Sequence, residues 1–166
     1  MNVSLYSPSS ATSPALIKMV EAFFMHEVLP YDAAKTQKAL EVLLDSPALG
    51  KVWLINVIDE HNNTHTVGHL VVSISFSLET ASRIAVVDQF YLDPEWRSKG
   101  VGTFVVPAVE KALANEGVGQ ISMEVNIGNA GAKRFYERMG YTPRRQHYIM
   151  TKPLVVEIPD AIEMVS

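Results

Sequence analysis

A short segment rich in glycine and basic residues, RSKGVG at residues 97–102, follows a turn-like sequence and opens an apolar helical pattern. The first amides of a helix have no partner inside it and point toward one place, where the helix dipole adds positive potential. Glycines let a phosphate approach the backbone without a Cβ in the way. Arg97 and Lys99 add full charges, so the segment from Arg97 to Thr103 predicts a site for a phosphate-bearing ligand.

Glycines at this spacing are not specific, because a strand-to-helix turn that merely requires glycine would look the same. The segment is not a dinucleotide fingerprint, since Thr103 to Val105 offers no third glycine. It is not a nucleotide P-loop either, since the lysine and hydroxyl residue of that motif are absent.

Tyr136 is a second residue that could do chemistry. At about 100° per residue, Asn129, Lys133 and Tyr136 fall within roughly 60° of each other on a predicted helix. This spacing puts Tyr136 at the edge of the apolar face, where its hydroxyl could reach a cleft. A core tyrosine whose hydroxyl has only a structural partner would show the same spacing.

The elements that must position these residues alternate in type along the chain. The expected order is β-α-α-β-β-β-α-β-α-β, with an antiparallel front half and a parallel crossover in the second half. We therefore expect an α/β fold, with a mixed sheet and helices on both faces. Strands are expected at 3–6, 52–58, 67–78, 84–92, 121–125 and from 148. Helices are expected at 14–28, 32–44 and 129–139, with another that the segment 97–102 opens and that runs to about 115.

Local signals support several of these boundaries. Ser13 followed by proline is a typical helix start with a capping hydroxyl, and Gly140 follows the last helix as glycines often do. Pro107 lies inside the third helix and removes one hydrogen bond. Because the apolar spacing (Val101, Phe104, Val105, Ala108, Ala112) continues across it, we expect a bend rather than an end.

Composition excludes several classes of protein. The chain has 166 residues, 48% hydrophobic and 19% charged, which fits one ordered domain. It contains no cysteine, so disulfides and thiol nucleophiles are excluded. A net charge of -4 disfavours nucleic acid and anionic membranes as partners. The histidines show no metal spacing, so we expect no metal, and the lack of a signal peptide or apolar span predicts a cytoplasmic protein.

Two segments resemble one family. The first is DQFYLDPEWRSKGVG at 88–102; the second is NAGAKRFYERMGY at 129–141, preceded by Asn126. They are similar to the Arg/Gln-x-x-Gly-x-Gly/Ala motif and the Asn-x-x-Ala-x-x-Phe-Tyr motif of the GCN5-related N-acetyltransferases, the GNAT superfamily. The resemblance covers residues 84–142 well, and the order of elements extends it to the whole chain. It implies the GNAT fold as a single domain, 1–166.

The resemblance implies transfer of an acetyl group from acetyl-CoA to a primary amine of a small molecule or peptide. A lysine-like amine has a pKa near 10.4, so deprotonating it at neutral pH costs about 3.4 units, roughly 4.6 kcal/mol. A base must take that proton, and the departing thiolate needs an acid. By resemblance Tyr136 is the acid and Asp88 the base, with Glu124 as a weaker alternative. An exposed strand carboxylate is an equally good account of Asp88.

The same resemblance assigns the cofactor site. The residues expected to hold acetyl-CoA are Phe90, Tyr91, Leu92, Arg97, Ser98, Lys99, Gly100, Val101, Gly102, Thr103, Asn129 and Lys133. Family members have a strand bulge near the first of these. Asn129 would also cap its helix. Arg144 and Arg145 either meet the 3′-phosphate of CoA or form a solvated basic pair.

The resemblance divides the domain into an acceptor-side front half (1–80), a cofactor-binding core (84–142) and a final strand with a tail (143–166). His26, Glu27, Tyr31 and Asp32 would border the acceptor, although a solvated helix end explains them as well. A non-catalytic acyl-CoA-binding sensor or scaffold is the alternative function. Because family members often dimerise, a homodimer is also expected, with the apolar tail at 154–158 adding a strand to the partner.

Overall fold

The computed structural model describes residues 2–146 and 149–154. Its elements, in chain order, are β1 (Asn2–Tyr6), α1 (Pro14–His26), α2 (Ala33–Asp45), β2 (Gly50–Ile58), β3 (Thr64–Ser77), β4 (Ser82–Leu92), the 3-10 turn η1 (Pro94–Trp96), α3 (Val101–Asn115), β5 (Val118–Met123) and α4 (Ala130–Arg138). The expected α/β class and the order of elements through the last helix are confirmed.

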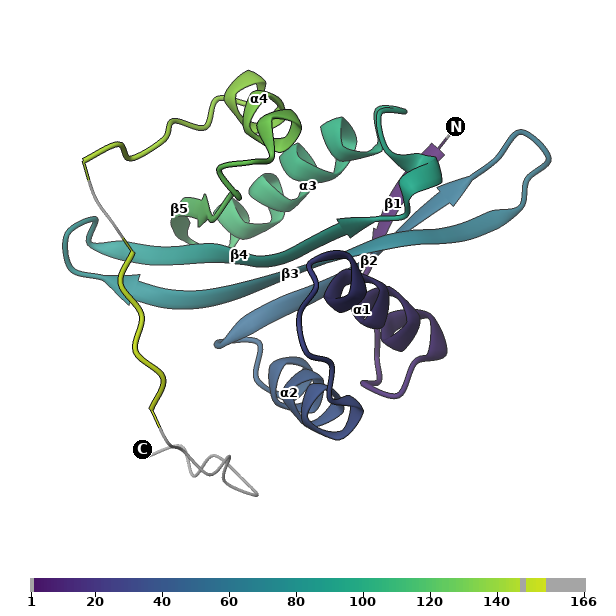
Figure 1. Cartoon of the computed structure of the whole chain (residues 1–166), viewed down its shortest axis with the longest axis horizontal. Helices are drawn as coiled ribbons and strands as arrows, with labels where there is room; N and C mark the ends of the chain where they lie inside the picture. The colour runs from purple at the N-terminus through teal and green to yellow at the C-terminus, as the bar shows by residue number, and fades with distance from the viewer. Residues whose placement is uncertain (1, 147–148, 155–166) are drawn as a thin grey trace.

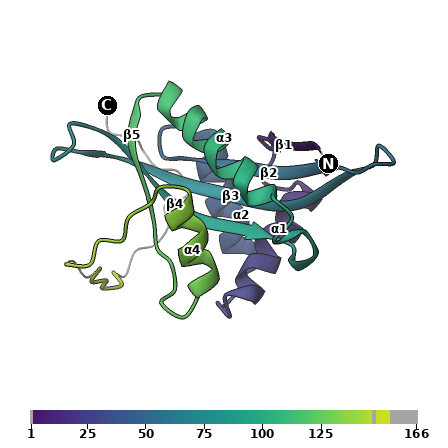
Figure 2. The same cartoon turned by 90° about the horizontal axis from the view of Figure 1, so that it is seen from above.

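One mixed sheet organises the molecule, with its strands in the order β1-β2-β3-β4-β5. The first four strands pair antiparallel, and β5 pairs parallel with β4. A parallel pair needs a crossover connection, which α3 provides. In Figure 1, α1 and α2 cover one face of the sheet and α3 and α4 cover the other; Figure 2 shows the same arrangement from above.

Each face of the sheet has its own hydrophobic core. Because strand side chains alternate between faces, neighbouring residues of one strand serve different cores. On the α3 side, Leu70 and Val72 pack with Val105 and Val109. On the other side, Val71 packs with residues of α1 and α2, including Leu16. The sheet is therefore covered by helices on both faces, and its paired strands are buried between two cores.

Helix ends follow the expected chemistry with one exception. Asp32 caps α2 by accepting a hydrogen bond from the Lys35 amide at 3.1 Å. Gly140, with φ of 93°, takes the left-handed conformation just past α4. Ser13 is the residue before α1, but its hydroxyl makes no capping bond. The expectation of a capping hydroxyl there was wrong; the helix start depends on Pro14, whose fixed φ suits the first position.

The helix α3 continues through Pro107 rather than ending there, as expected; the bend at Pro107 stays a prediction. Its buried residues are Val101, Val105, Val106, Val109 and Leu113. Phe104, which we expected on the inner face, is 48% exposed. The stripe advances mainly in steps of four residues, and this turns Phe104 outward.

The last expected strand begins at residue 148, which lies outside the described residues, and residues 149–154 form no strand. The proposed dimerisation segment at 154–158 also lies almost wholly outside them. The fifth strand spans Val118–Met123 rather than 121–125, so Glu124 lies just beyond its end. No helix in the described part of the chain is long and apolar enough to span a membrane.

Candidate active site

The strand β4 contains a bulge at Asp88. Val71 of β3 pairs with Gln89, and the next β3 residue, Val72, pairs with Val87, so Asp88 has no partner across the ladder. A bulge of this kind bends the strand and increases its twist. The pairing of β4 with β5 ends at Val87, although β4 continues to Leu92. The backbone from Asp88 to Leu92 therefore has no strand partner on the β5 side.

A narrow apolar pocket lies where the two strands separate. Its walls include Val87, Phe90, Met123, Val106 and Tyr136, and its volume of about 10 Å³ leaves room for about one water molecule. The sheet thus opens between β4 and β5, beneath α3 and α4.

The hydroxyl of Tyr136 has no hydrogen-bond partner within the described part of the chain. Its ring packs edge to face on Phe135 and Tyr141, at centroid distances of 5.0 and 5.5 Å. Desolvation by these surroundings raises the pKa of Tyr136 to about 12. The hydroxyl therefore keeps its proton at neutral pH and is free to donate it to a ligand. Tyr141 differs, because its hydroxyl donates to Glu110 Oε1 at 2.7 Å.

The Asp88 carboxyl is accessible to solvent at the bulge. The protein around it nevertheless removes part of its hydration, and this raises the pKa of Asp88 above its ordinary value. A carboxylate with a raised pKa is a better proton acceptor than an ordinary one. Glu124 is also exposed, but it follows β5 and lies outside the bulge.

The segment between η1 and α3 takes an irregular course. Ser98 and Gly100 have φ values of 58° and 86°, both in the left-handed region. A Cβ on Gly100 would meet no atom within 4 Å, so glycine is favoured there by backbone conformation rather than by space. Gly100 is the N-cap residue of α3, and no side chain caps that helix start. The amides of Val101, Gly102 and Thr103 thus precede the first bond of the helix, which the Phe104 amide makes to the Gly100 carbonyl at 3.2 Å, and they have no partner inside it.

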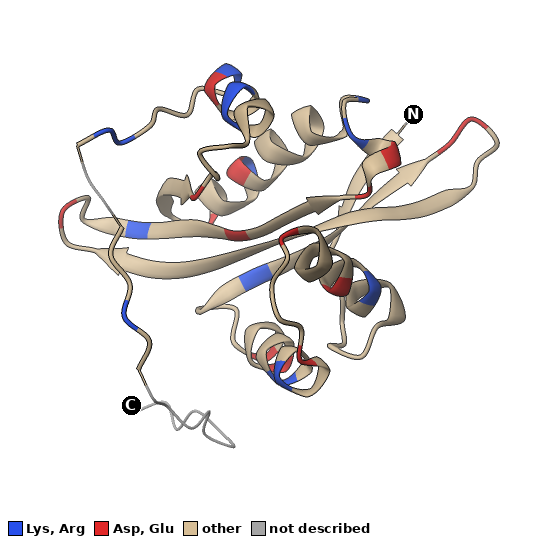
Figure 3. Ribbon diagram, in the orientation of Figure 1, with Lys and Arg blue, Asp and Glu red and all other residues tan. Residues whose placement is uncertain are grey.

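Two basic side chains of this segment contact the protein. Arg97 donates from Nε to the Leu92 carbonyl at 2.8 Å and lies 5.5 Å from the centre of the Tyr91 ring. The ammonium of Lys99 lies 5.3 Å from the centre of the Trp96 ring. Figure 3 shows basic residues gathered in this turn before α3. The charges of Arg97 and Lys99 precede the amides of the first turn of α3 in the chain. Arg97 also bonds the turn to the last residue of β4.

Gly102 has a packing role that the sequence did not reveal. A Cβ at this position would lie 3.1 Å from Cζ of Phe135 and 3.8 Å from Cζ of Phe90. Glycine here therefore lets α3 approach α4 and β4 closely. This is a different reason from close approach of a phosphate, which motivated the expectation.

The three β4 residues expected at the cofactor differ in orientation. Phe90 lines the pocket on the α3 side. Tyr91 is buried with the core of the opposite face. The Leu92 carbonyl is already bonded to Arg97. The Asp93 amide bonds to the Val67 carbonyl of β3, and hydrogen-bonded pairs alternate along an antiparallel ladder, so the backbone of Tyr91 also points toward β3. Only the backbone groups of Phe90 and Leu92 point toward the open edge of β4, and the expectation that Tyr91 offers its backbone there was wrong.

Residues of α4 have partners of their own. Asn129 accepts the Ala132 amide through Oδ1 at 2.9 Å, which is an ordinary helix cap. Lys133 forms an ion pair with Glu137 at 3.2 Å. Both are exposed, with Thr103, on the side of the molecule that carries α3 and α4.

The residues expected near the acceptor do not form one cluster. Asp32 caps α2, and Tyr31 packs on Phe24 at 5.5 Å. His26, at the end of α1, accepts a hydrogen bond from Arg97 at 3.3 Å. The end of α1 and the turn before α3 are therefore in direct contact. Glu27, Arg144 and Arg145 are exposed. No group of three or more His, Cys, Asp or Glu within 2–146 and 149–154 could hold a metal ion.

His69 is a buried polar residue that sequence reasoning missed. It is fully buried between Phe23 and Tyr91, and its Nε2 donates to Gln89 Oε1 at 2.8 Å. Its Nδ1 has no hydrogen-bond partner among the residues that the structure describes. Burial lowers the pKa of His69 to about 4, so the ring is neutral at pH 7. One polar residue within the apolar run at 67–72 was the signal that could have found it.

The lowered pKa of His69 predicts an acid-labile fold. Its unfolded pKa is near 6.5 and its folded pKa is about 4, so the unfolded chain binds the proton first. Stability is complete above pH 6.5 and declines as pH falls toward 4. We expect a loss of about 2 kcal/mol between about pH 7.5 and pH 5, measured by urea unfolding. His69→Leu should lack this loss; an equal loss in that variant would contradict the prediction.

The sequence model of the acetyltransferase (GNAT) family matches residues 18–141. This chain belongs to the GNAT family. The match contains both motifs, the bulged strand and the uncapped start of α3.

Solved structures share the GNAT fold over nearly the whole chain. An integron cassette protein from the Cole Harbour salt marsh metagenome has a TM-score of 0.77 at 23% identity, covering 93% of this chain and 92% of its own. A probable acetyltransferase has a TM-score of 0.75 at 15% identity, covering 95% and 100%. An aminoglycoside acetyltransferase from an uncultured soil sample, in complex with trehalose, has a TM-score of 0.70 at 16% identity, covering 92% and 97%.

A curated relative matches over a shorter stretch of the chain. An uncharacterised N-acetyltransferase of Methanocaldococcus jannaschii is 28% identical over 58 residues, which is 35% of this chain and 26% of the relative. The match thus spans about a quarter of the relative's length.

Proposed function

We propose that this GNAT protein transfers an acetyl group from acetyl-CoA to a primary amine of a small molecule or peptide. The observation that carries the proposal is the opening of the sheet. β4 continues to Leu92 after its last pair with β5 at Val87, and Tyr136 lies at that opening with an unpartnered hydroxyl in the described residues.

The residues present fit acetyl-CoA, which supplies an acetyl group activated as a thioester. The free amides from Val101 to Thr103, with Lys99 beside them, would hold the phosphates. The backbone of Phe90 and the amide of Leu92 would bond the pantetheine amides along the unpaired edge of β4. Asn129 and Lys133 would border the cofactor from α4, once Lys133 leaves Glu137.

Two side chains would manage the protons. Asp88 takes the proton of the attacking amine, directly or through water, and its raised pKa suits this role. Tyr136 gives a proton to the departing thiolate. Its raised pKa keeps that proton on the hydroxyl until it is transferred. The amine loses one proton to Asp88, and the sulfur gains one from Tyr136.

The acceptor would lie on the front half, residues 1–80, where α1 and the end of β4 meet. The single domain would thus divide into an acceptor side, a cofactor core at 84–142 and a C-terminal segment from 143. The related aminoglycoside acetyltransferase is consistent with a small polyamine-like acceptor. We further propose that the protein is cytoplasmic and that it forms a homodimer. Light scattering, which measures the molar mass in solution, tests the homodimer.

Two measurements test the proposal together. Calorimetric titration with CoA should show binding, and thiol release from acetyl-CoA should depend on an added amine. The panel should include polyamines, aminoglycosides, amino acids and short peptides. The chain contains no cysteine, so it adds no thiol background. Absence of CoA binding at millimolar ligand would refute the proposal, and binding without turnover of any acceptor would favour a sensor.

A further inference from the structure

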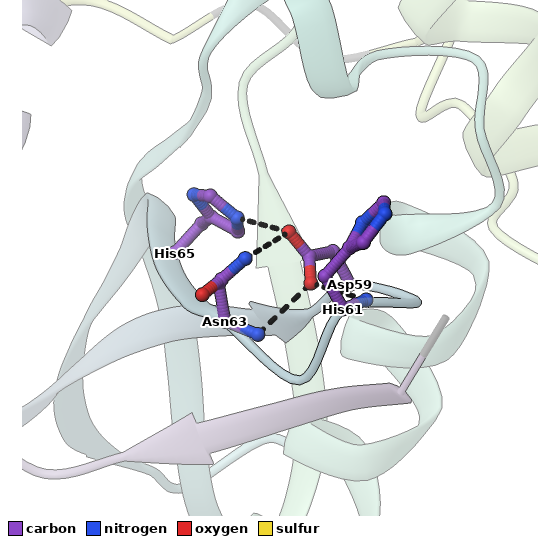
Figure 4. A network of polar contacts seen from close by, with 4 residues as sticks. All are labelled: Asp59, His61, Asn63 and His65. Carbon is purple, nitrogen blue, oxygen red and sulfur yellow. Dashed lines mark hydrogen bonds and ion pairs between the residues drawn. The ribbon is translucent and has the colours of Figure 1, made fainter.

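The hairpin between β2 and β3 carries a compact polar network outside the site described above (Figure 4). One oxygen of Asp59 accepts the backbone amides of His61 and Asn63, each at 2.9 Å. The other accepts from the Asn63 side chain at 3.2 Å and from His65 Nε2 at 2.8 Å. These bonds hold the pKa of the Asp59 carboxyl well below its usual range, so it is ionised at neutral pH. The network fixes both the turn and the His65 ring.

The hairpin is in contact with the turn before α3. The His65 ring lies 5.7 Å from that of Trp96, with 38° between their planes. Lys99 in turn lies 5.3 Å from the centre of the Trp96 ring. The Asp93 amide donates to the Val67 carbonyl at 2.8 Å, which brings the same turn against β3. A continuous series of contacts thus runs from Asp59 through His65 and Trp96 to Lys99.

These contacts restrict the position of Lys99, whose side chain is exposed. A lysine near the face of a tryptophan gains about 0.5–1 kcal/mol at an exposed site. That contact requires a fixed indole, and the His65 ring limits how Trp96 can turn. Loss of the ring would free Trp96 and allow the ammonium to move away from the uncapped start of α3. The effect would fall on ligands with phosphate groups and not on the thioester end.

We propose that His65 is a positioning residue for cofactor binding. From the β2–β3 hairpin it orients Trp96 and Lys99, and so raises the affinity of the turn for the phosphates of CoA. The inference depends on the proposed function, because it requires that CoA bind at this turn. His65 touches none of the reacting groups, so its loss should change cofactor affinity without changing kcat.

The test compares His65→Ala with His61→Ala in the full chain. His61 is the matched control, because it contributes only its backbone amide to the network. We expect His65→Ala to raise the Kd for CoA and the KM for acetyl-CoA about three- to fivefold, with kcat unchanged. His61→Ala should match the wild type. His65→Phe keeps a ring against Trp96 but cannot donate to Asp59, so it should recover part of the affinity.

A second acyl donor separates positioning from general damage. S-acetylpantetheine has the thioester but lacks the phosphates next to this turn, so its KM should be the same in the wild type and in His65→Ala. An equal rise for both donors, or an unchanged Kd for CoA in His65→Ala, would overturn the inference. Absence of CoA binding by the wild type would instead refute the proposed function and remove the basis of the inference with it.

Discussion

Replacing Tyr136 with phenylalanine should lower kcat by roughly 10³-fold, within the range that a positioned general acid contributes. The change removes only the hydroxyl, and that hydroxyl has no hydrogen-bond partner in the described residues. The apolar contacts with Phe135 and Tyr141 remain. We therefore expect the Kd for CoA and the melting temperature to stay close to the wild-type values. Steady-state kinetics, calorimetry and thermal melting measure the three quantities.

The matched control for this variant is Tyr141→Phe. The Tyr141 hydroxyl donates to Glu110, so its removal should cost about 1 kcal/mol of stability and leave kcat largely intact. The two tyrosines thus predict opposite outcomes for the same chemical change. Since the pKa of Tyr136 is about 12, its loss of a proton should not limit the rate below about pH 11. Full turnover by Tyr136→Phe would show that another group protonates the thiolate.

Replacing Asp88 with asparagine should lower kcat/KM by roughly 10²- to 10³-fold, because the amide cannot accept the proton of the amine. The pKa of Asp88 is raised, so in the wild type the rate should increase with pH above the ordinary carboxyl range. The rise of the rate that follows the ionisation of Asp88 should disappear in Asp88→Asn. Only the rise that follows deprotonation of the amine substrate should remain. The measurement is the pH profile of kcat/KM, obtained for both enzymes at limiting acceptor and saturating acetyl-CoA.

Stability provides an independent check on Asp88. A raised folded pKa means that the ionised carboxylate is less favourable in the folded protein than in the unfolded chain at neutral pH. Removing the charge should therefore not lower the melting temperature. Glu124→Gln, beyond the end of β5, is the control and should retain activity. A large loss in Glu124→Gln, with a normal profile in Asp88→Asn, would reassign the base.

The sequence by itself determined the parts of this protein that depend on local chemistry. Asn129 and Gly140 mark the two ends of α4 as expected, because caps depend on the backbone of a few neighbouring residues. The segment from Arg97 to Gly102 was recognised for the same reason, since its glycines and charges are contiguous. The alternation of strands and helices gave the mixed sheet with helices on both faces, which the structure and the family match confirm.

Only the tertiary structure decided features that join distant segments. The family resemblance implied a bulge near Phe90, but its position at Asp88 depends on the register of β4 against β3, which no local pattern encodes. The packing role of Gly102 depends on Phe135, which belongs to another helix. The hydrogen bond from Arg97 to the Leu92 carbonyl depends on where β4 ends. His65 reaches Trp96 only because the hairpin lies beside η1. Side-chain packing and strand register are set by the whole fold, so the sequence could name the chemical groups but not show which of them meet.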